Sequence, residues 1–305
     1  MHVLSDLKPS VESAPIEGAR MLARCIEDVQ SELDALRLEL NVLRRRDETL
    51  NFYMHRLDEE LRLAARIQQD FLPKSLPQIG SVYFHTLFRP AGYVSGDLYD
   101  VMRLDERHIA FYLADAVGHG MPAALLTMFL KHSLVTKDIT PSGYRLLAPS
   151  EALRRLNEAF VAQALTHASF ATALYGMIDV KTHQVTLARA GHPIPLVLRA
   201  DGTLERIVEC DGGLLGVFPD EVFSDATVTL DPGDRLVLFT DGVEMGFGGG
   251  TAPDDTAWKA ELQQHASLDG SALLLELSRT LDAAAGSLDP KDDLTVIIVE
   301  NRKAA

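Results

Sequence analysis

A heptad repeat of apolar residues runs without interruption from Leu22 to Phe71, and the stretch contains neither glycine nor proline. Apolar residues fill the first position of each repeat except at Asp47 and Gln68, and the fourth position is leucine in most repeats. A 4-3 spacing kept over about seven heptads predicts a long coiled-coil helix. Leucine at the fourth position favours a parallel pair of chains, so we expect a homodimer; an antiparallel arrangement in a larger bundle stays open.

The ends of the repeat define three segments. Residues 1–20 are polar and contain proline, which predicts a disordered N-terminus, and residues 21–72 form the coiled coil. Pro73 and Pro77 end the helix, since a proline restricts the residue before it. Residues 73–305 are then a separate domain. The polar residues Asp47 and Gln68 either set the local register or weaken the seam so that the helix can switch; the sequence leaves both open.

Composition excludes several classes of function. The formal charge of −15 argues against a nucleic-acid partner, because such binding relies on a basic face. No apolar stretch reaches the ~20 residues of a membrane helix, and no signal peptide is evident. Two cysteines, Cys25 and Cys210, form no disulfide framework. We therefore expect a cytoplasmic protein without a membrane partner.

The second domain reads as strands joined by hairpins, with a few helices. This pattern predicts packed antiparallel sheets flanked by helices, an α+β fold. The expected strands are Val82–Arg89, His108–Asp115, Ala171–Asp179, Gln184–Ala190, Pro195–Arg199, Leu204–Glu209, Arg235–Thr240 and Leu294–Glu300, and the expected helices are Pro122–Lys137, Pro149–Thr166 and Ser271–Ala285.

Four aspartates stand at the ends of these apolar runs: Asp97, Asp115, Asp241 and Asp292. Carboxylates beside glycines suit a hard divalent cation, because glycine lets the backbone approach closely. Without a metal such a cluster is unfavourable, since like charges raise each other's pKa values. The sequence therefore predicts an oxygen-ligand, two-metal site for phosphoryl chemistry.

Five motifs in order carry a family resemblance: SGDLYD, ADAVGHGMPAAL, ARAGHPIPLVL, LFTDGVEM and DDLTVIIV, preceded by the linker AARIQQDFLP. Over residues 64 to 300 the chain resembles the metal-dependent (PPM, type-2C) protein serine/threonine phosphatases, in their bacterial SpoIIE-like branch. The resemblance implies a sandwich of two antiparallel sheets with helices outside. It also implies two Mn²⁺ or Mg²⁺ ions at one edge, and a water held between them that attacks phosphorus.

The resemblance assigns roles residue by residue. Asp115 matches the carboxylate that bridges both ions, and the backbone carbonyl of Ala116 is a further metal ligand. Asp97 matches the acidic residue that holds metal-bound water, and Asp241 and Asp292 match the remaining metal ligands. The expected catalytic residues are thus Asp97 and Asp115. Ser95 departs from the family pattern, which commonly has glycine there.

Other residues keep two interpretations. His119 is either a general acid for the leaving serine or a structural hydrogen-bonding residue, and the second is favoured; His192 is expected to be structural. Asp100 is either a distant ligand or a polar strand end. Asp293 is expected to face outward, opposite to Asp292. Arg89 either contacts phosphate or faces solvent.

Two classes of function compete. The first is a protein serine/threonine phosphatase regulated through the coiled coil; its substrate by resemblance is a phosphorylated anti-sigma-factor antagonist, and an upstream sensor protein is a further candidate partner. The second is a catalytically inactive coiled-coil scaffold with a phosphatase-like platform. Hydrolysis of small phosphate compounds shares the metal chemistry, although no P-loop motif is present. The intact carboxylates favour the enzyme.

Overall fold

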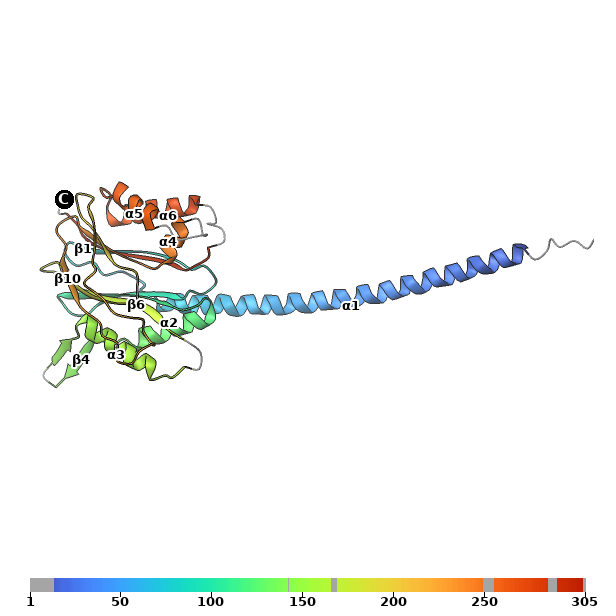
Figure 1. The fold of residues 1–305 in the computed structure, drawn as a ribbon, viewed down its shortest axis with the longest axis horizontal. Helices are drawn as coiled ribbons and strands as arrows, with labels where there is room; N and C mark the ends of the chain where they lie inside the picture. The colour runs from blue at the N-terminus through green and yellow to red at the C-terminus, as the bar shows by residue number, and fades with distance from the viewer. Residues whose placement is uncertain (1–13, 142, 166–168, 249–254, 285–289, 304–305) are drawn as a thin grey trace, which may run out of the picture. The chain divides into compact units, whose positions relative to one another are not determined.

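The computed structural model describes residues 14–141, 143–165, 169–248, 255–284 and 290–303 (Figure 1). The chain divides into two units, residues 1–60 and residues 61–305, and helix α1 (Ala14–Phe71) contributes to both. No helix in these described ranges is long and apolar enough to cross a membrane.

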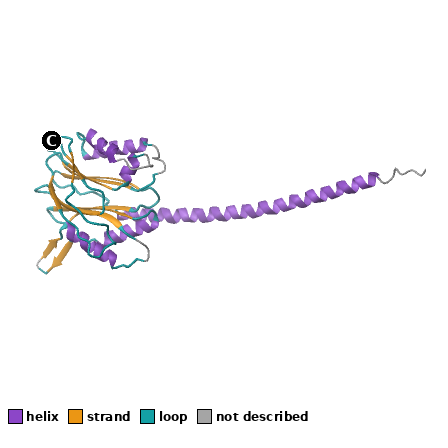
Figure 2. Cartoon of the chain, in the orientation of Figure 1, coloured by secondary structure: helices purple, strands orange, loops and turns teal. Residues whose placement is uncertain are grey.

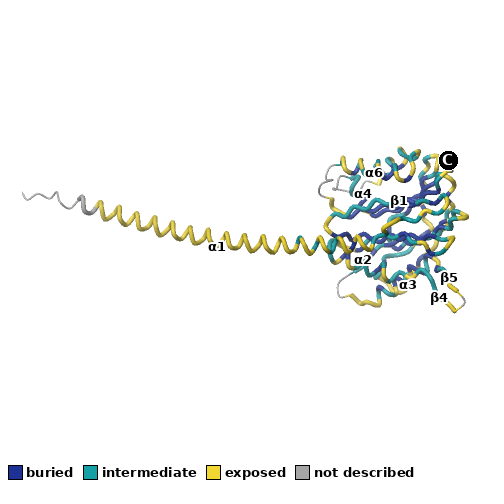
Figure 3. The backbone as a smooth tube through the Cα atoms, turned by 180° about the vertical axis from the view of Figure 1, so that it is seen from behind, coloured by how far each residue is buried: buried dark blue, intermediate teal, exposed yellow. Residues whose placement is uncertain are grey.

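The first unit is the greater part of α1, and its predicted seam lies open along the single chain (Figure 3). The apolar heptad residues from Leu22 to Leu57 are 44–67 % exposed. The predicted long helix is confirmed, whereas its pairing stays a prediction. The helix also takes in residues 14–20, which the sequence assigned to a disordered end, since Pro15 is tolerated in a first turn. Residues 1–13 lie outside the described residues.

The second unit is a sandwich of two five-stranded antiparallel sheets (Figure 2), which confirms the predicted fold class. The first sheet has the strand order β1 (Val82–Arg89), β12 (Leu294–Asn301), β11 (Arg235–Phe239), β8 (Leu196–Leu198) and β9 (Leu204–Arg206). The second has the order β10 (Ala226–Thr229), β7 (Gln184–Ala190), β6 (Ala171–Asp179), β3 (His108–Ala116) and β2 (Asp97–Arg103).

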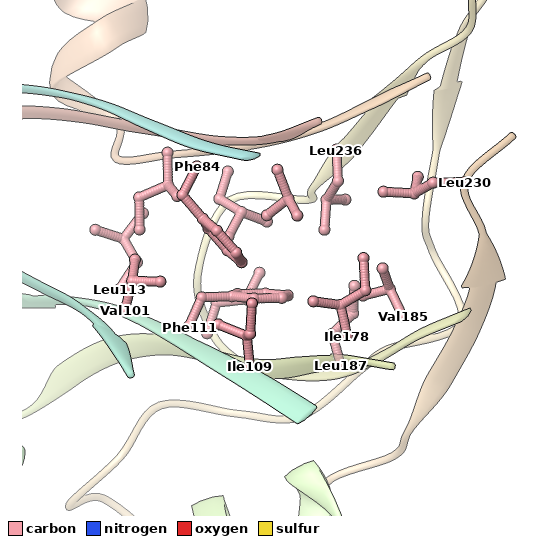
Figure 4. Close-up of a cluster of buried hydrophobic side chains, with 14 of the residues drawn as sticks. Phe84, Val101, Ile109, Phe111, Leu113, Ile178, Val185, Leu187, Leu230 and Leu236 are labelled. Atoms are coloured by element: carbon pink, nitrogen blue, oxygen red, sulfur yellow. The ribbon is translucent and has the colours of Figure 1, made fainter. Parts of the chain in front are cut away.

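Side chains of alternate strand residues fill the space between the sheets (Figure 4). Phe84, Leu236 and Ile297 from the first sheet meet Phe111 and Leu187 from the second, and all five are buried. Burying such side chains stabilises the fold by about 1.5–3 kcal/mol each. The two sheets are therefore held at a fixed spacing, which also fixes the spacing of residues at their edges.

Helices cover the outer face of each sheet. The second sheet carries α2 (Met121–Ser133) and α3 (Pro149–Val161). The first carries α4 (Gly242–Phe247), α5 (Asp255–Gln264) and α6 (Gly270–Ala283), and Trp258 of α5 is completely buried against Phe239. A hairpin of β4 (Lys137–Thr140) and β5 (Gly143–Leu146) stands apart from both sheets.

Several helix boundaries differ from the sequence prediction. Helix α2 ends at Ser133 rather than Lys137, because Leu134 adopts an extended conformation and β4 begins at Lys137. Helix α3 ends at Val161 rather than near Thr166. The glycine-rich stretch that begins at Gly246 lies partly in α4, which ends at Phe247, and residues 249–254 lie outside the described residues.

Candidate active site

The antiparallel topology gathers the predicted aspartates at one edge of the sandwich. Strand β2 begins where β3 ends, so Asp97 pairs directly with Asp115. In the other sheet, Asp241 follows β11 and Asp292 precedes β12, and these two strand ends are adjacent, with Phe239 opposite Val296. Each sheet thus supplies two carboxylates.

Asp97 joins the two sheets at the deep end of this site. Its carboxylate is 1 % exposed and accepts hydrogen bonds from the hydroxyl groups of Thr240 (2.8 Å) and Thr295 (2.6 Å), which lie on the opposite sheet. Burial, together with repulsion from Asp115, raises the pKa of Asp97 well above its usual range. The two threonines oppose this shift because they hydrogen-bond the charged form.

Asp115 is less buried than Asp97 and lies near the carboxylates that adjoin the other sheet. Burial raises the pKa of Asp115 to about 8, and repulsion from Asp241, Asp292 and Asp293 adds to the shift. Burial and Asp241 raise the pKa of Asp292 as well. The carboxylates therefore lie close enough to oppose each other's ionisation, as the sequence argument required.

The turn before Asp97 is fixed by hydrogen bonds from three directions. The Ser95 hydroxyl accepts from the Asp97 amide (3.0 Å), which gives Ser95 a function at a position where glycine is common. The Gly96 amide donates to Asp293 (2.6 Å), and its carbonyl accepts from Ala116 (3.1 Å). A Cβ atom on Gly96 would lie 3.2–3.3 Å from three neighbouring atoms, so a side chain there would push the turn away from Ala116.

Gln68, near the end of α1, holds the same turn. Its side-chain amide donates to the Ser95 carbonyl (2.7 Å) and accepts from the Ser95 amide (2.9 Å), and the residue is 5 % exposed. The sequence treated Gln68 as a polar seam residue of the coil, and this interpretation is wrong. The heptad spacing continues into residues 61–71 of the helix, which belong to the second unit. There Gln68 contacts Ser95 of the same unit.

Asp293 also differs from its prediction. It is 5 % exposed, and its two carboxylate oxygens accept from the amides of Ala91 (2.7 Å) and Gly96 (2.6 Å). The expectation that it faces outward is therefore wrong, because Asp292–Asp293 precedes the regular strand and strand alternation does not yet apply. Asp293 positions the first motif from the opposite sheet.

Two further candidates are engaged elsewhere. Asp100 forms an ion pair with Lys131 of α2 (2.9 Å), which supports the polar strand-end interpretation. Arg89 forms an ion pair with Asp282 (2.8 Å) and donates to the Ser278 carbonyl (3.2 Å) on α6. Neither side chain is free to serve the site as placed.

The two histidines occupy different surroundings. His119 is exposed, and its charge partly offsets the effect of burial and Asp241 on the pKa of Asp292, so it lies near that carboxylate. His192 is 1 % exposed, and its Nδ1 atom is 2.7 Å from the Thr172 hydroxyl. Burial and the neighbouring Arg189 lower the pKa of His192 to about 3, so the ring is neutral at physiological pH.

A pocket of about 380 Å³ opens beside the carboxylates. Asp115 and Asp241 line it from the two sheets, His192 lines its wall, and Arg206 and Lys259 bring positive charge. Sequence reasoning missed Arg206 and Lys259, because neither lies in one of the motifs; only the tertiary structure brings β9 and α5 to this edge.

The donor chemistry fits divalent cations, although the carboxylates do not form a closed cage. Carboxylate and backbone carbonyl oxygens are the ligands that Mg²⁺ and Mn²⁺ prefer. Within the described ranges, no three acidic, histidine or cysteine side chains converge closely enough to hold an ion by themselves. Magnesium keeps several water ligands in most protein sites, so few direct contacts from the protein suffice.

The comparisons with known proteins agree on one family. The family model described as Stage II sporulation protein E (SpoIIE) matches residues 105–302. The phosphoserine phosphatase RsbU of Bacillus subtilis is 31% identical over 221 residues, which cover 71% of this chain and 64% of RsbU. Two further curated relatives are matched over 32% and 45% of their length, so the chain spans less than two thirds of these relatives.

Solved structures share the fold. The SiaA-PP2C domain of Pseudomonas aeruginosa superposes with a TM-score of 0.68 at 21% identity and covers 81% of this chain and 97% of that domain. The RsbU and RsbW domains of Rv1364c from Mycobacterium tuberculosis give a TM-score of 0.60 at 25% identity, with 76% and 64% coverage.

Proposed function

Because the chain belongs to the SpoIIE family, we propose that it is a metal-dependent protein serine/threonine phosphatase. One observation carries this proposal: carboxylates from two different sheets gather at one edge of the sandwich, beside an open pocket, where those that adjoin one sheet raise the pKa of Asp115 on the other. An acidic cluster of this kind disfavours its own ionisation, and bound divalent cations would stabilise its charged form. The printed function of RsbU, phosphoserine phosphatase, supports the same reaction class.

Asp115, Asp241, Asp292 and the Ala116 carbonyl are the groups that would hold two Mn²⁺ or Mg²⁺ ions, with Asp97 behind them. When bound, such ions supply positive charge toward phosphate oxygens and lower the pKa of water. Asp97 keeps its carboxylate fixed through Thr240 and Thr295. The pocket beside Asp115 and Asp241 would admit the phosphoserine side chain. His119, exposed near Asp292, is the candidate for proton transfer to the leaving serine.

The proposed substrate is a phosphorylated regulatory protein, in particular an anti-sigma-factor antagonist, in the cytoplasm. The support is the likeness to RsbU and to a structure that combines RsbU and RsbW domains. A catalytically inactive scaffold is the less favoured alternative, because every position proposed to supply a carboxylate ligand is occupied by aspartate.

Regulation is proposed to enter through α1, whose seam would form a homodimer and respond to an upstream sensor protein. Gln68 supports this route, because the same helix that carries the seam hydrogen-bonds the turn before Asp97. A signal can switch the helix between two arrangements only if their free energies lie within a few kcal/mol of each other.

The proposed activity is tested by Mn²⁺-dependent hydrolysis of p-nitrophenyl phosphate and of a phosphoserine protein. Asp115→Asn is expected to lower kcat by at least about a thousandfold, since a central ligand and its charge are lost. Asp220→Asn, an exposed carboxylate elsewhere, is the matched control. Wild-type turnover in Asp115→Asn at saturating Mn²⁺ would refute the assignment.

A further inference from the structure

Of the three basic side chains that line the pocket beside the carboxylates, Arg206 alone has no acidic partner within the described part of the chain. Arg189 donates to the carbonyls of Cys210 and His192 and forms an ion pair with Asp211. Lys259 forms an ion pair with Asp255. The guanidinium of Arg206 is exposed and has no hydrogen bond or ion pair among the described residues, although it lines the same pocket as Asp115 and Asp241.

The register of the first sheet fixes where Arg206 stands. Arg206 on β9 is opposite Leu196 on β8, and Leu196 is opposite Val237 on β11. Directly paired residues share a face of a sheet, and both Leu196 and Val237 point into the cluster beneath α5 and α6. Arg206 is therefore on the face that carries α5, which agrees with its place in the pocket beside Lys259.

The same register separates Arg206 from the proposed reaction centre. Strand β9 is two strands away from β11, and Arg206 is level with Val237, four residues before Asp241, so the two backbones are about 10 Å apart across the sheet and roughly 13 Å apart along it. This separation exceeds the length of an arginine side chain, so Arg206 lines a part of the pocket away from the carboxylates, where it would meet residues that flank the phosphoserine. An extended peptide advances about 3.3–3.6 Å per residue, so a side chain within about three residues of the phosphoserine reaches this position.

The charges around the pocket indicate which substrate side chain Arg206 would bind. The chain carries a formal charge of −15, and Asp115, Asp241, Glu244 and Asp255 all line the pocket, so an acidic segment is repelled unless a local cation receives it. Resting on the proposed phosphatase function, we propose that Arg206 is a specificity-determining residue. It pairs with an aspartate or glutamate within about three residues of the substrate phosphoserine.

The test compares alanine-based phosphoserine heptapeptides that carry a single Asp, Asn or Lys at each of the three positions on either side. With the full chain and saturating Mn²⁺, at least one Asp peptide is expected to exceed its Asn counterpart in kcat/KM by about two- to five-fold, the range of a partly exposed ion pair. Arg206→Gln should bring the ratio of kcat/KM for the Asp and Asn peptides to about one, and Arg206→Lys should keep part of the Asp preference. Arg206→Glu should favour the Lys peptide instead.

Arg279→Gln on α6 is the matched control, since this exposed arginine lies outside the pocket and its loss should leave the ratio unchanged. An Asp preference absent from wild type, or kept in Arg206→Gln, overturns the proposal. An equal loss by Arg206→Gln on p-nitrophenyl phosphate, which has no flanking side chain, also overturns it, because Arg206 would then act on the phosphoryl group. Absence of Mn²⁺-dependent turnover by wild type on every substrate would instead refute the phosphatase assignment.

Discussion

At the scale of single residues, neighbouring aspartates of the last motif have separate functions. Asp292 belongs to the group of carboxylates that repel each other, whereas Asp293 is buried and accepts hydrogen bonds from two backbone amides. The residue type is the same, so its function is determined by burial and by hydrogen-bond partners. This difference separates the effects that the two substitutions should have.

Asp293→Ala is expected to destabilise the fold by about 1–3 kcal/mol, because two amides lose their charged acceptor. Asp292→Ala should leave stability nearly unchanged and weaken Mn²⁺ binding instead. Urea unfolding and calorimetric titration with Mn²⁺ measure the two effects on both variants. The assignment fails if Asp292→Ala proves the less stable of the pair.

The raised pKa of Asp115 predicts how the stability of the metal-free protein depends on pH. Because folding raises this pKa to about 8, the metal-free protein loses stability as pH rises from about 4 through 8, where the unfolded carboxyl is already ionised. Asp115→Asn should therefore stabilise the metal-free protein at pH 8 by at least about 1 kcal/mol, or roughly 2–4 °C, and have a smaller effect at pH 5. Thermal unfolding in EDTA measures this; an Asn variant less stable at pH 8 would contradict it.

His192 predicts the reverse dependence. Its folded pKa of about 3 lies below the unfolded value, so the contribution of the neutral ring is present above about pH 6.5 and is lost as pH falls toward 3. At pH 5 the loss is roughly 2 kcal/mol relative to pH 7.5, from 1.36 kcal/mol per pH unit. The stability of His192→Gln should change less between these two pH values. An equal change in both proteins, measured by urea unfolding in EDTA, would place the histidine outside the buried site.

At the scale of elements, apolar periodicity predicted most of the sandwich, because strands buried on both faces leave long apolar runs such as Leu294–Asn301. It missed strands β2 and β10, the exposed hairpin of β4 and β5, and helices α4 and α5. The hairpin and α4 bury no apolar face long enough to leave a periodic signal. The motif aspartates were found for a related reason: each stands where a buried strand begins or ends. Gln68 and Arg206 were missed because their roles depend on contacts between distant segments.

Helix α1 gives the test at this scale. Gln68→Leu keeps the side chain buried and removes both hydrogen bonds to Ser95, so we expect kcat to change by about threefold or more with the fold retained. Gln69→Leu, at the exposed neighbouring position, is the matched control. Stopped or continuous assays with p-nitrophenyl phosphate measure kcat. Equal kcat in wild type and Gln68→Leu would show that the end of α1 does not influence Asp97.

At the scale of the whole molecule, the exposed seam of α1 predicts the oligomeric state. Ten heptad residues from Leu22 to Leu57 are about half exposed or more in the single chain, which is unfavourable in water unless a second helix covers them. Leu36→Lys, Leu43→Lys and Leu50→Lys together should convert a dimer to a monomer in light scattering. Replacing Ser31, Asn41 and Thr49, exposed polar residues on the face away from the seam, with lysine is the control, since it adds the same charge. A monomeric wild-type chain would reject the coiled coil.

The two-sheet origin of the carboxylates has a consequence for genetics. Asp97 and Asp115 belong to one sheet and Asp241 and Asp292 adjoin the other, so their separation is set by the buried side chains between the sheets, such as Phe111 and Ile297. A substitution at one of these positions changes the spacing of the ligands without touching them. A screen for loss of activity will therefore recover interior positions alongside the aspartates. Only variants sorted by folding as well as by activity will map the site.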